Sequence, residues 1–221
     1  MKEEVFNAAL AGLLHDIGKV AQRAGLKPKK PYSAEEYGTH GYHAVISDDF
    51  VSEFVPKKFQ SGLWGVLQHH HPCDARSKIV QLADWWSSGE RRQGEEIDQE
   101  EVNQSRLIPV TSLVELEKER KDEELKYRYN IGAWNLSEEN FPHNDNSKTT
   151  GKNDYLKIWN QFTEEIRDWQ NSTGTQWEEQ DGPAFLTTLK ALMQKYFWCI
   201  PSATPWQGEK KKAQRSYPDV S

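Results

Sequence analysis

Cysteine is scarce in this chain, and so are long apolar runs. Cys73 and Cys199 are the only cysteines in 221 residues, which is too few for a disulfide framework and favours a reducing cytoplasm. No stretch approaches the roughly 20 apolar residues of a membrane span. The N-terminus lacks the basic and apolar regions of a secretory signal. We therefore expect a cytoplasmic protein with no membrane partner.

The chain also lacks an excess of positive charge. Its formal net charge is −6, which excludes the overall basic character of proteins that coat nucleic acid, so any such contact should be local. Charged residues make up 28% and hydrophobic residues 36% of the chain, which indicates long exposed loops. Nine tryptophans, eight tyrosines and eight phenylalanines nevertheless argue against wholesale disorder.

Several catalytic motifs are absent. The sequence has no G-x-x-x-x-G-K-[ST] phosphate loop, no G-x-G-x-x-G after a strand and no G-x-S-x-G elbow. Cys73 lies beside a run of histidines, but it sits in an HPCD turn and nothing marks it as an activated nucleophile. The sequence therefore gives no support for a P-loop nucleotidase, a dinucleotide-binding enzyme or a serine hydrolase of these motif classes. It gives little support for a Cys–His nucleophile.

Helical periodicity is present at both ends of the chain. Pro56 suits the first position of one helix, and Asp74 is placed to cap another. The apolar spacing predicts helices over residues 4–21, 43–55, 56–71, 75–88, 155–170 and 183–198.

The middle of the chain has a different composition. Residues 90–104 form a charge run without a regular face, which predicts a solvated loop. The mixed segments 106–116 and 127–136 are candidates for paired strands, and 137–154 has the composition of turns and linkers. We expect a mainly α protein with an irregular or hairpin-containing insertion.

A histidine and an aspartate lie side by side within the first predicted helix. Helical neighbours are about 100° apart, so His15 and Asp16 can reach one side, and Lys19 lies over that side one turn later. An imidazole and a carboxylate can bind one metal or bridge two, and a lysine can hold a phosphate. The alternative is a salt-bridged, partly exposed helix face.

Histidines and a carboxylate recur on later predicted helices. His69 to His71 are consecutive, so two can flank a site while the third points away; the alternative is surface histidines at a helix end. His40 and His43 form an i, i+3 pair. Asp84 lies in an apolar stretch, where a buried carboxylate is costly unless something pairs with it.

Mixed imidazole and carboxylate ligands favour one or two divalent transition metals (Mn, Ni, Co, Fe or Zn) over calcium or magnesium alone. A site of that kind lowers the pKa of water and suits hydrolysis of phosphate esters. Trp85 and Trp86 follow Asp84 and are candidates for stacking on nucleobases; the alternative is packing in the core.

These motifs resemble the HD superfamily of metal-dependent phosphohydrolases. LLHDIGK, at residues 13–19, is similar to its commonest signature, and LAD, at 82–84, to its closing aspartate. With THGYHAVISDDFV, HHHP and IVQLADWWSSGERR, the chain more narrowly resembles the N-terminal HD nuclease domain of the large subunit of type III CRISPR effector complexes, above all the III-A form. The resemblance implies a permuted HD-superfamily helical domain.

The resemblance also assigns roles to individual residues. His15, Asp16 and Lys19 match the catalytic residues of the family. His43 matches the family's next histidine ligand better than His40 does, and His71 matches a variable position. Apart from the resemblance, Lys19, Arg23 and Arg91 are candidates to guide a nucleic-acid strand; the alternative for the two arginines is ordinary solvated surface charge. The implied metal ligands are His15, Asp16, His43, His69, His70 and Asp84.

The implied activity is metal-dependent cleavage of single-stranded DNA in an antiviral complex with guide RNA and other effector subunits. We expect HD core helices with the metal site in residues 1–92, an insertion in 93–155, and helices and a tail that complete the domain in 156–221. Proteins of the family continue into domains with a Gly-Gly-Asp-Asp motif, which this chain lacks. By this resemblance, we expect the chain to be a product truncated before the last helix of the HD domain. Two alternatives remain, a nucleotide phosphohydrolase and a non-catalytic structural module.

Overall fold

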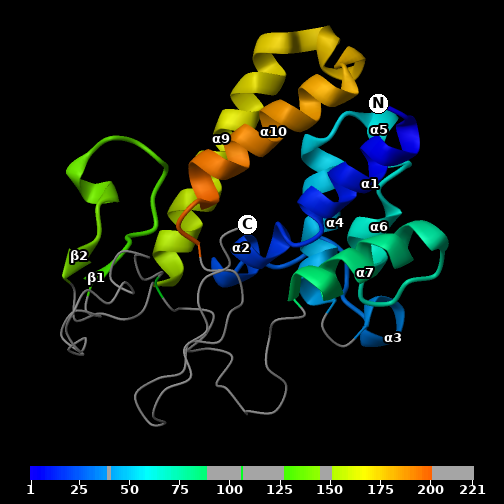
Figure 1. The fold of residues 1–221 in the computed structure, drawn as a ribbon, viewed down its shortest axis with the longest axis horizontal. Helices are drawn as coiled ribbons and strands as arrows, with labels where there is room; N and C mark the ends of the chain where they lie inside the picture. The colour runs from blue at the N-terminus through cyan, green and yellow to red at the C-terminus, as the bar shows by residue number, and fades with distance from the viewer. Residues whose placement is uncertain (39–40, 89–105, 107–126, 145–150, 201–221) are drawn as a thin grey trace, which may run out of the picture.

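The computed structural model describes residues 1–38, 41–88, 106, 127–144 and 151–200. This part of the chain is mainly helical, as predicted, with one small sheet (Figure 1). The elements are α1 (Glu3–Leu14), α2 (Gly18–Arg23), α3 (Ala34–Tyr37), α4 (Tyr42–Phe54), α5 (Lys57–Gln60), α6 (Trp64–Gln68), α7 (Ala75–Ser88), β1 (Tyr127–Arg128), η3 (Glu138–Asn140), β2 (His143–Asn144), α9 (Lys152–Thr173), η4 (Gly174–Glu179) and α10 (Gly182–Phe197).

The sheet is an antiparallel pair of two-residue strands. Tyr127 lies opposite Asn144, and Arg128 lies opposite His143. β1 falls in a segment expected to form a strand, whereas β2 falls in a stretch expected to be a linker. Residues 107–116, the predicted partner of β1, lie outside the described residues.

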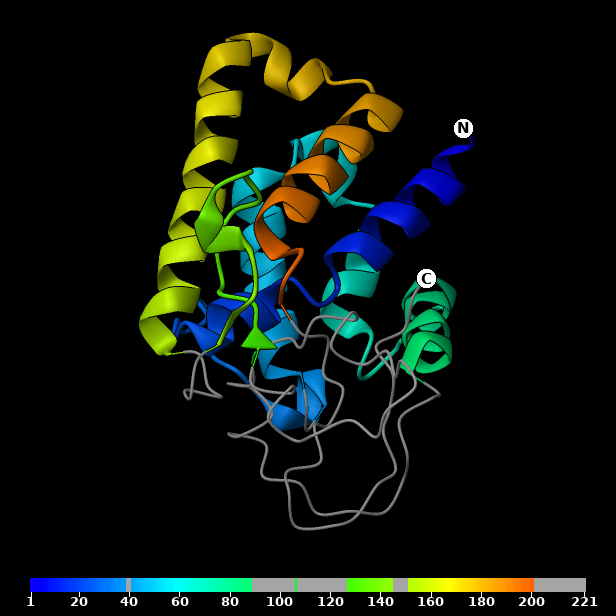
Figure 2. The ribbon, with the colours of Figure 1, turned by 60° about the vertical axis from the view of Figure 1, so that its left-hand side comes forward.

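The larger hydrophobic core of the described residues joins the N-terminal helices to α9 and α10. It contains Leu10 and Leu14 from α1, Phe50 from α4, Phe162 from α9 and Phe185 from α10, all nearly inaccessible to solvent. α9 and α10 run antiparallel, joined through η4, and α10 passes beside α1 in both views (Figures 1 and 2). The C-terminal helices therefore complete the core that the N-terminal helices begin.

The predicted helix over 4–21 is wrong at residues 15–17. α1 ends at Leu14 and α2 begins at Gly18, with a tight turn between them. The turn is held against α4, because Oγ of Ser47 accepts a hydrogen bond from the Gly18 N–H at 2.9 Å and donates to the His15 carbonyl at 2.9 Å. These contacts between distant segments override the apolar periodicity.

The predicted helix over 56–71 is also interrupted. α5 covers Lys57–Gln60 and α6 covers Trp64–Gln68, so Pro56 precedes α5 and the three histidines follow α6. The Gln60 side-chain amide donates to the Val55 carbonyl at 2.7 Å, which ties the end of α5 to the end of α4. The turn after α5 then places Leu63 in the core.

The remaining helices lie close to their predicted positions. α7 begins as expected after Asp74, whose Oδ1 accepts the Ser77 N–H at 2.7 Å. α9 begins at Lys152 and so crosses the expected boundary after residue 155. Among the described helices, not one combines the length and apolar character needed to cross a membrane.

Candidate metal site

Side chains from four segments meet where α1, α4, α6 and α7 pack together. His15 and Asp16 lie in the turn between α1 and α2, His43 lies in the first turn of α4, and Asp84 lies in α7. The turn after α6 adds two further imidazoles. They form two groups, within each of which one ligand atom from every residue lies within 4.8 Å of the others: His43 with His69 and His70, and His15 with Asp16 and Asp84.

Asp16 belongs to the second group and also contacts the first. Its Oδ1 is 3.0 Å from Nε2 of His43, and its Oδ2 is 3.5 Å from Nε2 of His15. Its Oδ2 also accepts a hydrogen bond from Nζ of Lys19 at 2.6 Å. One carboxylate therefore faces both groups, which is the arrangement needed for a ligand that bridges two ions.

The other side chains close the site. Oδ1 of Asp84 is 3.7 Å from Nε2 of His15, and Nε2 of His70 is 3.1 Å from Nε2 of His43. The rings of His69 and His70 have centroids 4.1 Å apart. Consecutive side chains of a helix would instead point about 100° apart. The turn after α6 thus directs two consecutive imidazoles inward.

Backbone carbonyls fix the orientation of two of these imidazoles. Nδ1 of His15 is 2.7 Å from the Gly12 carbonyl, and Nδ1 of His69 is 2.8 Å from the Val66 carbonyl. Each carbonyl belongs to the last turn of a helix, where it has no partner within the helix. Because a carbonyl only accepts, Nδ1 carries the hydrogen, and Nε2 of each ring faces the cluster, where it offers a lone pair when the ring is neutral.

Three buried ligand atoms make no well-aligned hydrogen bond. They are Nε2 of His69, Nε2 of His15, which lies 3.5 Å from Oδ2 of Asp16, and Oδ1 of Asp16, which lies 3.0 Å from Nε2 of His43. An unsatisfied buried polar atom costs about 1–3 kcal/mol, so three at one place need an explanation. A divalent cation with nitrogen and oxygen ligands would satisfy all three, and the residues present therefore fit such an ion.

The imidazoles of one group are held neutral. Burial, followed by the charge of His70, lowers the pKa of His69 to about 3. Burial and the nearby His43 lower the pKa of His70 to about 4, and burial lowers the pKa of His43. A histidine must be neutral to bind a metal, so this group is ready to do so at neutral pH.

The carboxylates of the other group are held ionised. Burial acts to raise the pKa of Asp16, but the contact with His43 and the charges of His15 and Lys19 outweigh it, and the pKa is strongly lowered. Contact with His15 lowers the pKa of Asp84. The pKa of His15 itself is raised, because its contacts with the two carboxylates outweigh burial.

The strand-guiding candidates are spread more widely. Lys19 lies in the site, paired with Asp16. The guanidinium of Arg23 lies over the ring of Tyr155 in α9, 5.6 Å from its centroid. Arg91 lies outside the described residues, and so does His40.

His71 and Cys73 do not join the cluster. The His71 ring is exposed, with Nδ1 3.2 Å from the Glu36 carbonyl, so the third histidine of the run points away from the other two. Cys73 is exposed, in the turn before α7.

The surroundings of Asp84 differ from those expected. Leu82 and Trp86 are exposed, whereas Asp84 is half-buried and faces His15. Trp85 and Trp86 are 55% and 83% exposed, so the alternative that they pack in the core is wrong.

Sequence reasoning missed two residues that position the site. Ser47 is fully buried and holds the turn that carries His15. A Cβ at Gly18 would lie 2.0 Å from the His43 carbonyl oxygen, so only glycine allows α2 to approach α4 so closely. An isolated glycine within a helical pattern was the available signal for this contact.

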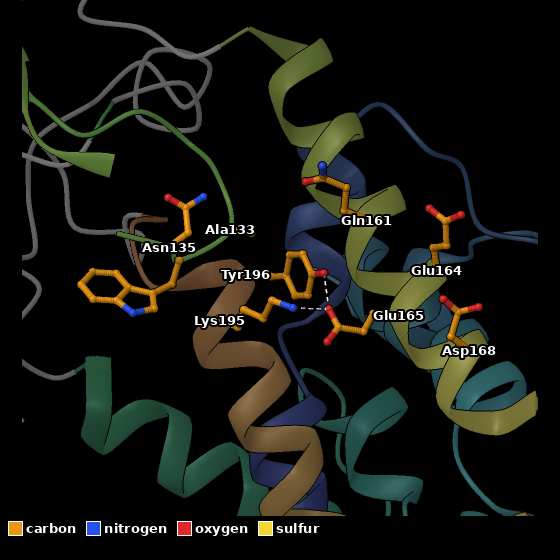
Figure 3. A pocket seen from close by; sticks show the side chains of 9 residues that line it. Ala133, Asn135, Gln161, Glu164, Glu165, Asp168, Lys195 and Tyr196 are labelled. Carbon is orange, nitrogen blue, oxygen red and sulfur yellow. Dashed lines mark hydrogen bonds and ion pairs between the residues drawn. The ribbon is translucent and has the colours of Figure 1, made fainter. Parts of the chain in front are cut away.

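A separate pocket of about 450 Å³ lies between α9, α10 and the loop at residues 133–135 (Figure 3). Glu165 projects into it from α9 and accepts hydrogen bonds from Nζ of Lys195, at 2.6 Å, and from the Tyr196 hydroxyl. Its lining residues include neither histidine nor cysteine. The pocket therefore lacks the ligand set of the metal cluster.

Comparison with known proteins agrees with this geometry. The HD domain family matches residues 1–124. The chain is 31% identical over 222 aligned residues to a protein of Methanocaldococcus jannaschii described as "CRISPR system single-strand-specific deoxyribonuclease Cas10/Csm1 (subtype III-A)". The match covers 96% of this chain and 25% of that relative, so the chain spans about a quarter of its length. No solved structure matches significantly. The chain therefore belongs to the HD domain family, and it matches the HD domain of the large subunit of type III CRISPR effector complexes.

Proposed function

We propose that this chain is a metal-dependent phosphodiesterase that cleaves single-stranded DNA, acting as the HD nuclease domain of a type III CRISPR large subunit. The observation that carries the proposal is the pair of three-residue groups joined by Asp16. The description of the relative as a single-strand-specific deoxyribonuclease supports the choice of substrate. One or two ions of Mn, Ni, Co, Fe or Zn are the expected cofactors, and a cytoplasmic complex with guide RNA and other effector subunits is the expected setting.

Each residue of the site has a part in this proposal. A bound divalent cation would supply Lewis acidity and lower the pKa of water. The backbone carbonyls behind the His15 and His69 rings turn Nε2 of each ring toward the cluster, where these two nitrogens would hold the cation. Asp16 would contribute ligand oxygens to both groups. Lys19, paired with Asp16, would place its charge near the phosphoryl oxygens, where negative charge grows during the reaction.

The test is a nuclease assay with the full chain on single-stranded DNA, duplex DNA and RNA. Mn²⁺, Ni²⁺, Co²⁺, Mg²⁺ and Zn²⁺ are compared with a chelator. We expect cleavage of single-stranded DNA that needs a transition metal and that falls at least about 100-fold when His15→Ala is combined with Asp16→Ala. Asp181→Asn is a matched control, because Asp181 caps α10 and asparagine also caps helices.

Other outcomes decide between this proposal and its alternatives. Release of phosphate from nucleotides without strand cleavage would identify a nucleotide phosphohydrolase. Equal inactivity of the wild type and of the double variant with every metal would favour a structural module.

A further inference from the structure

The helix that carries Asp84 also presents a row of apolar side chains to solvent. Ile79, Leu82, Trp85 and Trp86 of α7 are all among the exposed large hydrophobic residues. Exposed aromatic rings beside a reaction site are unusual in a folded domain, where such surface is normally buried or used for binding. The position of each ring relative to Asp84 indicates what it can contact.

Trp85 is the aromatic residue on the site side of this row. Successive residues of a helix are about 100° apart, so Trp85 is one such step from Asp84, whereas Trp86 is roughly 160° away. Nζ of Lys78 lies 5.2 Å from the centroid of the Trp85 ring and donates to the Gln81 side chain at 2.7 Å. An aromatic ring and a cation therefore share one edge of α7, and Trp85 is one helical step from Asp84, the residue of α7 that belongs to the cluster.

The charge of α7 differs from that of the chain. The helix carries Arg76, Lys78 and Asp84 and no other charged residue, whereas the whole chain has a net charge of −6. Asp84 faces His15 in the cluster, so the rest of the helix offers only positive charge. This is complementary to a phosphate backbone and fits the expectation of a local nucleic-acid contact.

We propose that Trp85 stacks on an unpaired base of the strand whose phosphate occupies the metal cluster, through the ring face opposite Lys78. The proposal rests on the proposed nuclease function and adds a substrate-binding residue to it. Base–aromatic stacking does not depend on base identity, because every base has a π-face. It does require a free face, and in a duplex the neighbouring bases occupy both faces. Trp85 would therefore favour single strands without favouring a sequence.

The experiment measures binding without cleavage. Fluorescence polarisation follows a labelled oligothymidylate, and a labelled abasic strand of the same length, in the presence of EDTA. We expect Trp85→Ala to weaken oligothymidylate binding between about 5-fold and 100-fold, which corresponds to the loss of one stacked base. Trp85→Phe should restore most of the affinity, and binding of the abasic strand should not change.

Trp134 provides the matched control. It is 54% exposed, almost the same as Trp85, but it lines the pocket between α9 and α10. Trp134→Ala should bind both strands as the wild type does. Thermal unfolding of each variant verifies that it is folded.

Three results would overturn the proposal: unchanged oligothymidylate binding by Trp85→Ala, equal weakening for both strands, or wild-type binding that does not distinguish them. Unchanged binding by Trp85→Ala would favour instead a role of the exposed Trp85 ring in contact with a protein partner. Failure of the nuclease proposal looks different, because base-dependent binding would persist while no metal supported cleavage.

Discussion

At the residue scale, the site depends on which nitrogen each histidine presents and on whether that nitrogen is protonated. His69 is almost completely buried, and its Nε2 has no hydrogen-bond partner while its Nδ1 contacts the Val66 carbonyl. Such a ring resists protonation, because the imidazolium would be buried without a counter-charge. The same burial that prepares the ring for a metal makes the metal-free protein sensitive to acid.

The predicted pH dependence follows from the direction of this shift. An unfolded histidine titrates near 6.5, whereas the pKa of His69 in the folded chain is about 3. Between these pH values the unfolded chain binds more protons than the folded chain. The free energy of unfolding therefore decreases by about 1.4 kcal/mol for each unit by which the pH is lowered, for this residue alone. His15 has the opposite sign, and its contribution is lost only above pH 6.5, as the pH rises through its raised pKa.

Urea unfolding in EDTA between pH 6.5 and 4.5 measures this effect. His69→Gln should show a shallower pH dependence than the wild type. His71→Gln serves as the control, because it makes the same substitution at an exposed ring outside the cluster. Parallel curves for the wild type and His69→Gln would show that His69 is not a buried neutral imidazole.

At the element scale, the site is built where α2 crosses α4. Gly18 permits the approach, and Ser47 satisfies its N–H. The contact places the His15–Asp16 turn over the first turn of α4, which carries His43. Any side chain at position 18 would push the two halves of the cluster apart.

Two glycine variants test this account. Gly18→Ala should destabilise the chain by more than about 3 kcal/mol, or prevent folding, since its Cβ would overlap the His43 carbonyl. Gly12→Ala is the matched change within α1, where a Cβ would meet nothing within 4 Å, and it should stabilise by roughly 0.5–1 kcal/mol. Thermal unfolding compares the two, and similar midpoints for both would contradict the proposed contact.

The sequence predicted most helices but not the two breaks that shape the site. α4, α7, α9 and α10 were predictable because each has a continuous apolar face and a recognisable end, such as the Asp74 cap. The breaks at residues 15–17 and 61–63 depend on contacts with distant segments, including Ser47. The convergence of His43 with the Asp16 carboxylate was suggested by residue type and family resemblance, whereas their 3.0 Å separation required the fold.

At the scale of the whole molecule, one core connects the site to helices that contribute no ligand. Phe185 of α10 is fully buried, and its ring packs against Phe59, Trp169 and Trp177. The α9–α10 pair therefore stabilises the N-terminal helices that position the cluster (Figure 2).

This connection predicts a large effect far from the ligands. Phe185→Ala should lower the free energy of unfolding by about 3–5 kcal/mol, because it leaves a cavity within the shared core. Phe141→Ala, at a phenylalanine that is 62% exposed, should change it by less than about 1 kcal/mol. Denaturant titration measures both, and a small loss for Phe185→Ala would show that α10 is not part of the common core.

The central claim is that six side chains from four segments share one cation-binding site. Anomalous scattering from crystals of the full chain soaked in Mn²⁺ tests it most directly. We predict one or two anomalous peaks about 2.0–2.3 Å from ligand atoms of the two three-residue groups of the site. If there are two peaks, the Asp16 carboxylate should lie between them. Manganese bound only elsewhere, or a cluster that stays metal-free at saturating Mn²⁺, would contradict the claim.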